Sequence, residues 1–437
     1  MTEAIISRLA SIHELRVISR TSVMSFKDTK LSVPDIAGKL HVDALVEGSV
    51  IRDGDRIRVH AQLIRAATDE HFWSEQYDRE LKDVLSLQSE VAQSIARKVE
   101  VTVTGKEHER LSAARQVSPD VYENYLKAWS AFENSTTKAD IQRTITYFEE
   151  ATRRDPSFGP AWVGLAQAYS ALGTVFVGGQ PEETRAKVVT SARRALEIDP
   201  QSADAYILIA SVQQKRWQWA EAEAGYKRAL ELSPNNASAH EHFASWLVWQ
   251  GRTKEAVDWA QRGRELDPLA VSGSSIAWIL FQAHRYEEAM HELRSDLAVH
   301  TDNEDALSTL GFVLIANNQP NDAIPVLEKV LTISDRSPAV LGVLTRAYAH
   351  AGRRTDALRL VEELKERKQR GYVPAGAFVN AYLGLGDNEE ALAWLEKAYA
   401  EHSNILQWMK VHPFMDALRE NPRFKDLLQR VGLDRTY

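Results

Sequence analysis

Two histidines flank a glutamate in the stretch SAHEHFA, and residues of these types can hold a metal ion or move protons. His240 and His242 are two positions apart, so on a helix they point to different sides. The pattern H-E-x-x-H, which places two histidines on one helical face for zinc binding, does not occur in the sequence. The histidines of HELRSDLAVH are nine residues apart and have no third candidate ligand nearby. We therefore expect no metal site and no cofactor.

Motifs for nucleotide binding and nucleophilic catalysis are also missing from the sequence. Neither the phosphate loop G-x-x-x-x-G-K-[ST] nor the nucleophile elbow G-x-S-x-G occurs, and the kinase catalytic loop is absent. The absence of cysteine excludes disulfides, thiolate metal sites and a cysteine nucleophile. Carboxylate pairs such as Glu287–Glu288 and Glu389–Glu390 fall where solvated turns between helices are expected. We predict a protein that is not an enzyme and has no catalytic residues.

Arg56 and Arg58 alternate with apolar residues just after an Asp-Gly pair at 53–54. An Asp-Gly pair between alternating stretches is typical of a two-residue hairpin turn. A turn at 53–54 would place Val50 opposite Ile57 on an apolar face and both arginines on the more polar face. This pattern favours a solvated or half-covered sheet face over a binding site for an acidic ligand.

The composition is that of an ordinary globular protein, with 437 residues, 44% hydrophobic content and a net charge of −8. The negative charge and the lack of basic runs argue against nucleic-acid binding by this chain. The N-terminus does not have the pattern of a signal peptide, and no stretch approaches the ~18 apolar residues that a membrane span needs. A cytoplasmic location is the default expectation, and a periplasmic one stays open if a segment is missing upstream.

The chain changes its pattern near residue 105. Before this point the sequence predicts a small α/β domain over residues 1–105: helices at 2–13 and 33–41, a short strand LRVIS at 15–19, the hairpin, and a strand HFWSEQYDREL that leads into a helix at about 83–98. Residues 106–118 are expected to form a linker. After residue 118 only helical periodicity remains, so the fold class is α+β, with a small α/β domain followed by an all-α solenoid.

The helical region repeats with a fixed period. Pro200, Pro234 and Pro268 end the similar stretches ALEIDP, ALELSP and GRELDP at intervals of 34 residues, the period of the tetratricopeptide helix-turn-helix unit. A small residue recurs in the second helix, where two helices must approach closely: Ala222, Ala256, Ala289, Ala323, Ala357 and Ala391. About eight repeats are predicted over 119–403, with an insertion loop at 173–183. A C-terminal capping segment is predicted at 404–437. The predicted repeats are 119–156, 159–200, 203–236, 237–269, 270–303, 304–337, 338–371 and 372–403.

Two further stretches carry a resemblance to a known family. VEGSVIRDGDRIRVHAQLIRAATDEHFWSEQYDRELKDVLSLQSEVAQSIA (46–96) closely resembles the TolB-like N-terminal domain of many bacterial regulators, and WMKVHPFMDALRENPRFKDLLQRVGL (408–433) resembles the tail that ends the same proteins. In that family these modules usually follow a winged-helix domain, an adenylate or guanylate cyclase domain, or a protein kinase. The resemblance implies that the first strand of the TolB-like domain is missing here.

Two functional hypotheses follow. The first is a non-catalytic protein-interaction or scaffold module, the sensing or regulatory half of a bacterial signalling protein, which binds a protein or peptide partner. The second is a C-terminal fragment of a longer cyclase, kinase or winged-helix transcription regulator whose activity lies upstream of Met1. The sequence does not define the partner, the oligomeric state or the pathway.

The predicted binding surface is the groove that the first helices of tetratricopeptide repeats form. The family's motif positions place aromatic residues in its middle and a basic and amide patch after them, without the Lys/Asn clamp for a C-terminal carboxylate. The residues of this predicted groove are Trp249, Trp278, Phe281, Phe312, Arg346, His350 and Asn380. The groove would suit a peptide with an apolar anchor and an acidic flank. The alternative, equally open, is that Trp278 and Phe312 only pack between repeats.

Overall fold

The computed structural model describes residues 2–435 apart from 11, 28, 102, 106, 108–115, 136 and 173–180. The chain forms two compact units. The first consists of Met1–Gln213, Glu221–His240 and Gly263–Ala270, and the second of Gln214–Ala220, Glu241–Arg262 and Val271–Tyr437. Most of the predicted linker at 106–118 lies outside the described residues, so a domain boundary near residue 105 stays a prediction.

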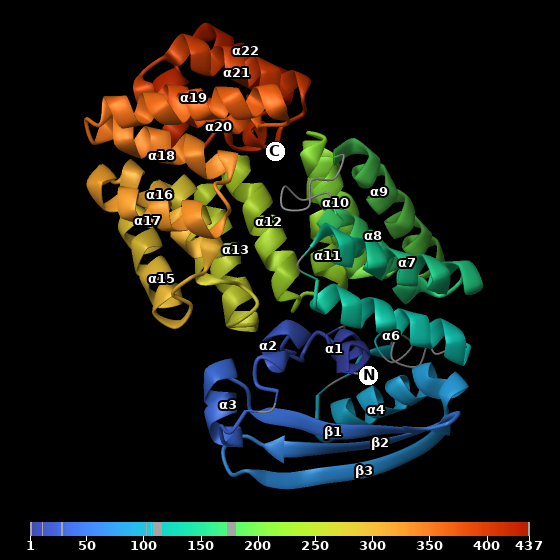
Figure 1. The fold of residues 1–437 in the computed structure, drawn as a ribbon. Helices are drawn as coiled ribbons and strands as arrows, with labels where there is room; N and C mark the ends of the chain where they lie inside the picture. The colour runs from blue at the N-terminus through green and yellow to red at the C-terminus, as the bar shows by residue number, and fades with distance from the viewer. Residues whose placement is uncertain are drawn as a thin grey trace. The chain divides into compact units, whose positions relative to one another are not determined.

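A three-stranded antiparallel sheet lies in the N-terminal part of the first unit, as the alternating sequence predicts (Figure 1). Its order is β1 (Ala44–Asp53), β2 (Arg56–Arg65) and β3 (Glu70–Glu80), and it is preceded by α1 (Thr2–Leu9), α2 (Arg20–Met24) and α3 (Val33–Leu40) and followed by η1 (Leu81–Asp83) and α4 (Val84–Lys98). The predicted strand at 15–19 is wrong. This stretch has no strand partner, because Leu15 and Val17 pack into the apolar core and the Leu15 carbonyl accepts a hydrogen bond from the Asn235 side chain at 2.7 Å.

The hairpin turn lies one residue later than predicted. Gly54 and Asp55 form the turn, so Val50 pairs with Val59 rather than with Ile57. Gly54 has φ 56°, and glycine in the first central position with positive φ suits a two-residue hairpin turn. Every partner moves by two residues, and because side chains alternate with a period of two, each residue keeps its predicted face.

Arg56 and Arg58 lie on the exposed face of the sheet, as predicted. Both contact Asp78 of β3, with N–O distances of 2.6 Å and 3.1 Å. Both arginines therefore have a carboxylate partner within the sheet, and the solvated-face interpretation accounts for their position. The opposite face of β2 is buried.

One continuous core joins the sheet to the first helical repeat. Its fully or nearly fully buried side chains come from β2, β3, α4, α1 and the helices that follow, among them Val59, Leu63, Tyr77, Val84, Leu87, Val91, Ile12, Val121, Tyr122 and Phe158. Within this core the Gln88 side chain donates a hydrogen bond to the Tyr122 hydroxyl at 3.0 Å. Buried side chains of the sheet and of the first helical repeat thus belong to one apolar cluster.

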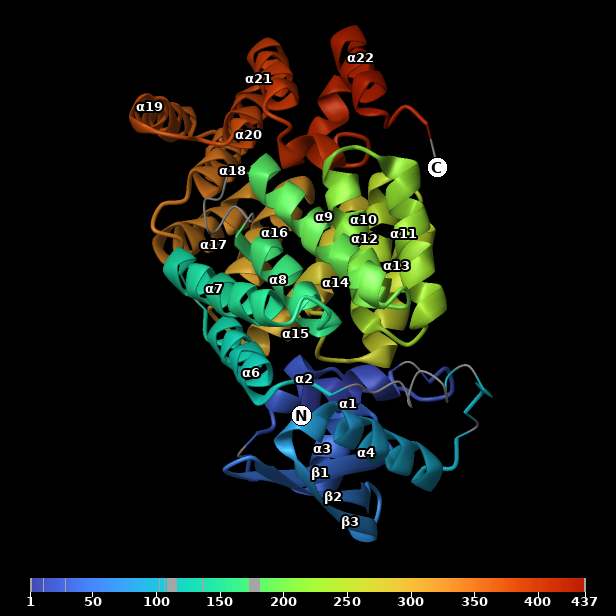
Figure 2. The ribbon, with the colours of Figure 1, turned by 90° about the vertical axis from the view of Figure 1, so that its right-hand side faces the viewer.

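Each predicted repeat range contains one pair of helices (Figure 2). The pairs are α6 (Pro119–Glu133) with α7 (Lys138–Arg154), α8 (Gly159–Leu172) with α9 (Pro181–Ile198), α10 (Ala203–Lys215) with α11 (Trp219–Leu232), α12 (Ala237–Trp249) with α13 (Thr253–Leu266), α14 (Gly273–Gln282) with α15 (Tyr286–Val299), α16 (Glu304–Ala316) with α17 (Pro320–Ile333), α18 (Pro338–His350) with α19 (Arg354–Arg370) and α20 (Ala375–Leu385) with α21 (Asn388–Ala400). The six alanines of the repeat pattern are fully buried. Most of the predicted insertion loop, residues 173–180, lies outside the described residues.

Two loops of the first unit are tied to each other by the Asp267 carboxylate. It accepts hydrogen bonds from the Ser19 amide at 2.7 Å and from the Ser22 hydroxyl at 2.6 Å. Asp267 belongs to the repeat stretch GRELDP, whereas Ser19 caps α2. The repeats thus hold the segment that leads from α1 to α3.

The chain ends in two 3-10 turns and one helix: η2 (Asn404–Trp408), η3 (Pro413–Leu418) and α22 (Pro422–Val431). Helix α22 packs on α21, where Arg423 contacts Glu389 at 3.0 Å and Arg430 contacts Glu396 at 2.7 Å. Residues 404–418, which contain η2 and η3, are called here the C-terminal segment. Across the described part of the chain, no helix is both long and apolar enough to cross a bilayer.

Candidate functional site

The C-terminal segment lies against the predicted groove, within the second unit. The rings of Trp278 and Trp408 are 5.3 Å apart between centroids. Phe414 lies 5.9 Å from Phe281 and is stacked on Phe312 at 5.4 Å. Three of the predicted groove residues, from α14 and α16, therefore face a neighbour from the same chain.

His412 lies at the centre of this aromatic cluster and is 2% exposed. Its ring centroid is 5.2 Å from that of Phe281 and 5.1 Å from that of Phe414. Its Nδ1 accepts a hydrogen bond from the Phe414 amide at 3.1 Å, so the ring proton is on Nε2. Burial, reinforced by the nearby Arg346 and Arg419, lowers the pKa of His412 to about 3. The imidazole is therefore neutral at physiological pH.

Arg346 of α18 covers the other side of Phe414, with the guanidinium carbon 3.9 Å from the ring centroid. Its Nε and Nη1 atoms are buried, and neither has a hydrogen-bond partner among the residues that the structure describes. Burial lowers the pKa of Arg346 to about 10, with Asp416 acting in the opposite direction. Helix α20 approaches closely here, because a side chain at Gly384 would lie 2.5 Å from the Arg346 Cα.

The other predicted groove residues differ in their surroundings. The Asn380 Oδ1 and the Trp249 Nε1 are buried and lack a hydrogen-bond partner within the described ranges. His350 is exposed at the end of α18, and partial burial and Arg346 lower its pKa. Whether any of the seven residues binds a partner stays a prediction.

A pocket of about 490 Å³ lies beside the C-terminal segment. It is lined by Gly251, Thr253, Gln282, Ala283, His284, Lys410, Val411, Asp416 and Arg419. The Gln282 side chain is 1% exposed, and both of its amide atoms lack partners within the described part of the chain. Arg419 and Asp416 pair with each other at 2.7 Å, and Lys410 is a further cation in the lining.

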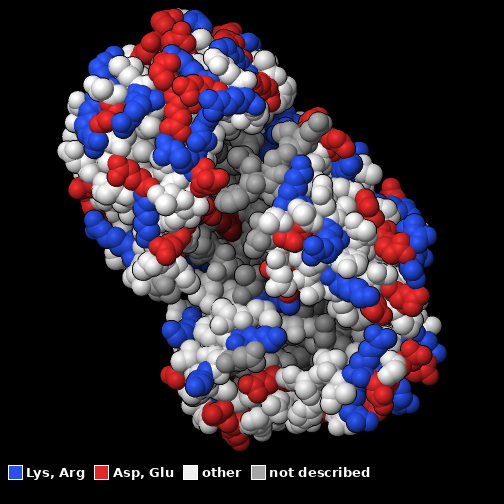
Figure 3. All heavy atoms as spheres, in the orientation of Figure 1, with Lys and Arg blue, Asp and Glu red and all other residues white. Residues whose placement is uncertain are grey.

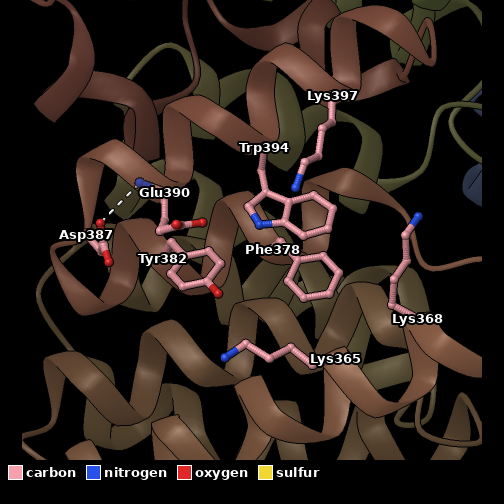
Figure 4. Close-up of a pocket in the computed structure, with 8 residues that line it drawn as sticks. All are labelled: Lys365, Lys368, Phe378, Tyr382, Asp387, Glu390, Trp394 and Lys397. Atoms are coloured by element: carbon pink, nitrogen blue, oxygen red, sulfur yellow. Dashed lines mark hydrogen bonds between the residues drawn. The ribbon is translucent and has the colours of Figure 1, made fainter.

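A second pocket, of about 530 Å³, lies between α19, α20 and α21 (Figure 4). Trp394 is stacked on Phe378 at 3.9 Å and is covered by the Lys397 ammonium at 3.8 Å. Lys365 and Lys368 line the pocket together with Tyr382, Asp387 and Glu390. Because Trp394 is enclosed on both faces, packing between two repeats explains its position. Over these helices, basic and acidic side chains are interspersed on the face that Figure 3 shows.

His240, the first histidine of the SAHEHFA stretch, is a buried residue of α12. The His240 ring is 4% exposed, and its Nδ1 lies 3.0 Å from the Asn236 carbonyl oxygen. Among the described residues, no group of three or more His, Cys, Asp or Glu side chains is placed to hold a metal ion.

Two family models described as tetratricopeptide repeat match the chain, at residues 314–373 and 377–400. Tetratricopeptide repeats are confirmed in this part of the chain. A protein named putative adenylate cyclase 3 from Rhizobium meliloti (strain 1021) is 31% identical over 177 residues, which are 40% of this chain. The match spans 28% of that protein's length.

Two solved structures have low similarity to this chain. A thermophilic TPR protein of Thermus thermophilus gives a TM-score of 0.38 at 14% identity. The match covers 45% of this chain and 99% of the Thermus chain. A chain of the APC/C hetero-tetramer Cut9–Hcn1 gives a TM-score of 0.43 at 16% identity. The match covers 61% of this chain and 52% of that chain.

The sequence pattern did not predict that the C-terminal segment lies against Trp278, Phe281 and Phe312. The tail WMKVHPFMDAL has a signal of burial, because its apolar residues are dense while Pro413 interrupts any helix. The side chains of Leu406, Met409, Met415 and Leu418 are fully buried. A tail with that density cannot be a polar cap along its whole length.

Proposed function

We propose that the chain is a non-catalytic protein-interaction module in the regulatory half of a bacterial signalling protein. Its N-terminal sheet and helices form a TolB-like domain, and its repeats bind a peptide or protein. The confirmed tetratricopeptide repeats support the interaction role, and the similarity to a protein named putative adenylate cyclase supports the signalling context.

One observation carries this proposal: the predicted groove already has an irregular peptide segment against it. The segment places Trp408 against Trp278 of α14 and Phe414 against rings of both α14 and α16, and its regular structure consists of short 3-10 turns. Apolar anchors spaced along a segment are the usual way in which a groove between helices holds a peptide. We infer that this surface takes a partner segment with two aromatic or large apolar anchors.

The test is to offer the segment as a separate molecule. A fluorescent peptide with the sequence of residues 404–418 is titrated into the full chain carrying Trp408→Ala and Phe414→Ala. We expect saturable binding to this variant and none to the unchanged chain, whose own segment fills the groove. Adding Trp278→Ala to the variant should abolish binding, and a peptide with alanine at both anchors should not bind.

Absence of binding by a folded variant would contradict the proposal, and circular dichroism establishes whether the variant folds. If alanine at both anchors unfolds the chain, Trp408→Leu with Phe414→Leu keeps more side-chain volume and serves in its place.

The alternative is that the chain is the C-terminal part of a longer cyclase, and the same relative favours it. An open reading frame upstream of Met1 that encodes a cyclase domain would support it. Under either proposal the chain itself forms no cyclic nucleotide, so measurable synthesis from ATP or GTP by the purified chain would contradict the non-catalytic role.

A further inference from the structure

The contact between the groove and the C-terminal segment is complementary in apolar shape but not in hydrogen bonding. The rings meet at ordinary aromatic distances. In contrast, Arg346 Nε and Nη1, Asn380 Oδ1 and Trp408 Nε1 are buried and have no hydrogen-bond partner in the described ranges. Leaving a buried polar atom without a partner costs about 1–3 kcal/mol. A ligand of similar shape that bonded to these atoms would therefore hold the groove more tightly than the segment does.

The charge of Arg346 defines what such a ligand would carry. Among the described residues, no carboxylate lies within ion-pair distance of its guanidinium. Asp416 acts on Arg346 only from longer range and pairs directly with Arg419. A buried guanidinium binds carboxylates through charge-assisted hydrogen bonds, which are roughly twice as strong as neutral ones. A carboxylate close to the place that Phe414 occupies would therefore accept hydrogen bonds from Arg346 Nε and Nη1.

The C-terminal segment has a less stable backbone structure than the helix pairs around it. It consists of two 3-10 turns, whose hydrogen bonds have poorer geometry than those of an α-helix. Both of its ends are fixed, by α21 before it and by α22 after it. The six alanines of the repeat pattern belong to the second helices of the pairs and not to residues 404–418.

We propose that residues 404–418 are an internal competitor for the groove, and that a partner peptide displaces them by placing an Asp or Glu side chain on Arg346. The partner is a segment with a large apolar anchor for the Trp278 and Phe312 rings and an acidic residue where Phe414 now lies. This inference rests on the proposed function, because it specifies the ligand and the regulation of the same groove.

The test compares two peptides that differ in one charge. Both have the sequence of residues 404–418, one with Glu and one with Gln in place of the residue that matches Phe414. They are titrated into the full chain carrying Phe414→Ala, with Phe414→Leu as a second variant if the first does not fold. We expect the Glu peptide to bind about tenfold more tightly than the Gln peptide. In a chain that also carries Arg346→Met, the two affinities should agree within about twofold.

Displacement of residues 404–418 is measured separately from binding of the peptide. The chain carries 13C-labelled methionine methyl groups, and the peptides carry none. Met409 and Met415 are fully buried in the unbound chain, so their methyl signals should move to exposed positions as the Glu peptide binds.

The possible outcomes separate the two proposals. If neither peptide binds, the proposed peptide-binding function is wrong. If both bind equally and Arg346→Met changes nothing, the groove proposal stands and the carboxylate inference is overturned. Binding that leaves the Met409 and Met415 signals unchanged would overturn the role of the segment as a competitor.

Discussion

The guanidinium carbon of Arg346 lies 3.9 Å from the centroid of the Phe414 ring, and this contact joins α18 to the C-terminal segment. We expect a double-mutant cycle with Arg346→Met and Phe414→Leu to give a coupling free energy of about 1–2 kcal/mol, because the contact is largely shielded from water. Urea unfolding measures it. The control pair is Arg353 and Tyr348, in which the guanidinium carbon lies 4.3 Å from the ring centroid and the arginine is exposed. For this pair we expect a coupling free energy of about 0.5 kcal/mol or less. Equal couplings for the two pairs would contradict the buried position of Arg346.

Stability should fall in acid because His412 is buried in its neutral form. Its pKa in the folded chain is about 3, below the ordinary value of 6.5. Between these values the unfolded chain binds a proton that the folded chain does not, so the contribution of His412 is full above pH 6.5 and is lost as the pH falls. The loss is about 1.4 kcal/mol per pH unit. The groups whose charge acts on His412 are Arg346, Arg419 and His284.

The measurement for His412 is the free energy of unfolding between pH 7 and 4 for the natural chain and for His412→Gln. The variant is less stable at pH 7 but should lack this part of the pH dependence. An identical slope in the two proteins would show that other groups cause the acid sensitivity.

Asp267 should be needed to hold the segment between α1 and α3. Its carboxylate accepts hydrogen bonds from Ser19 and Ser22 and is 1% exposed. Asp267→Ala leaves these donors unpaired, and we expect a loss of about 1.5–3 kcal/mol and faster amide hydrogen exchange over residues 19–24. Asp322→Ala, at an exposed aspartate in α17, is the matched control and should change neither. Unchanged exchange in Asp267→Ala would mean that the two loops are not tied by this residue.

Helices α18 and α20 meet at a glycine, and adding one methyl group there should be costly. A Cβ at Gly342 would lie 2.3 Å from the Ala377 carbonyl oxygen, which is backbone and cannot turn away. We expect Gly342→Ala to destabilise the chain by about 1–3 kcal/mol. Gly38→Ala is the control, because nothing lies within 4 Å of that position in α3 and alanine favours a helix. A neutral Gly342→Ala would contradict the close approach of the two helices.

The repeats could be predicted because their requirement is local and recurs. Every 34 residues a small side chain must let two helices meet, and the fully buried Ala222 and Ala391 show the same constraint five repeats apart. The sheet could be predicted from its alternation. The exact turn could not, because moving every partner by two residues leaves the apolar and polar faces unchanged. Only the backbone geometry at Gly54 selects the later turn.

The course of the C-terminal segment could not be predicted from the pattern. Trp278 and Phe414 are 136 residues apart, which is four periods of 34, but the period alone does not predict that residues 404–418 lie against α14 and α16. The contact depends on shape complementarity between side chains, which sequence spacing does not encode. A dense apolar tail interrupted by Pro413 indicates only that the tail is buried somewhere.

Solvent exposure of the methionine methyl groups tests the central claim, that residues 404–418 lie in the groove, most directly. The chain has five methionines, so each 13C-methyl signal can be assigned by single Met→Leu variants. The measurement is the relaxation enhancement caused by a soluble nitroxide. The account predicts that Met409 and Met415 are protected as well as Met290 of α15, which is 2% exposed. If the methyl groups of Met409 and Met415 instead relaxed as fast as an exposed side chain, the segment would lie outside the groove and the account would be wrong.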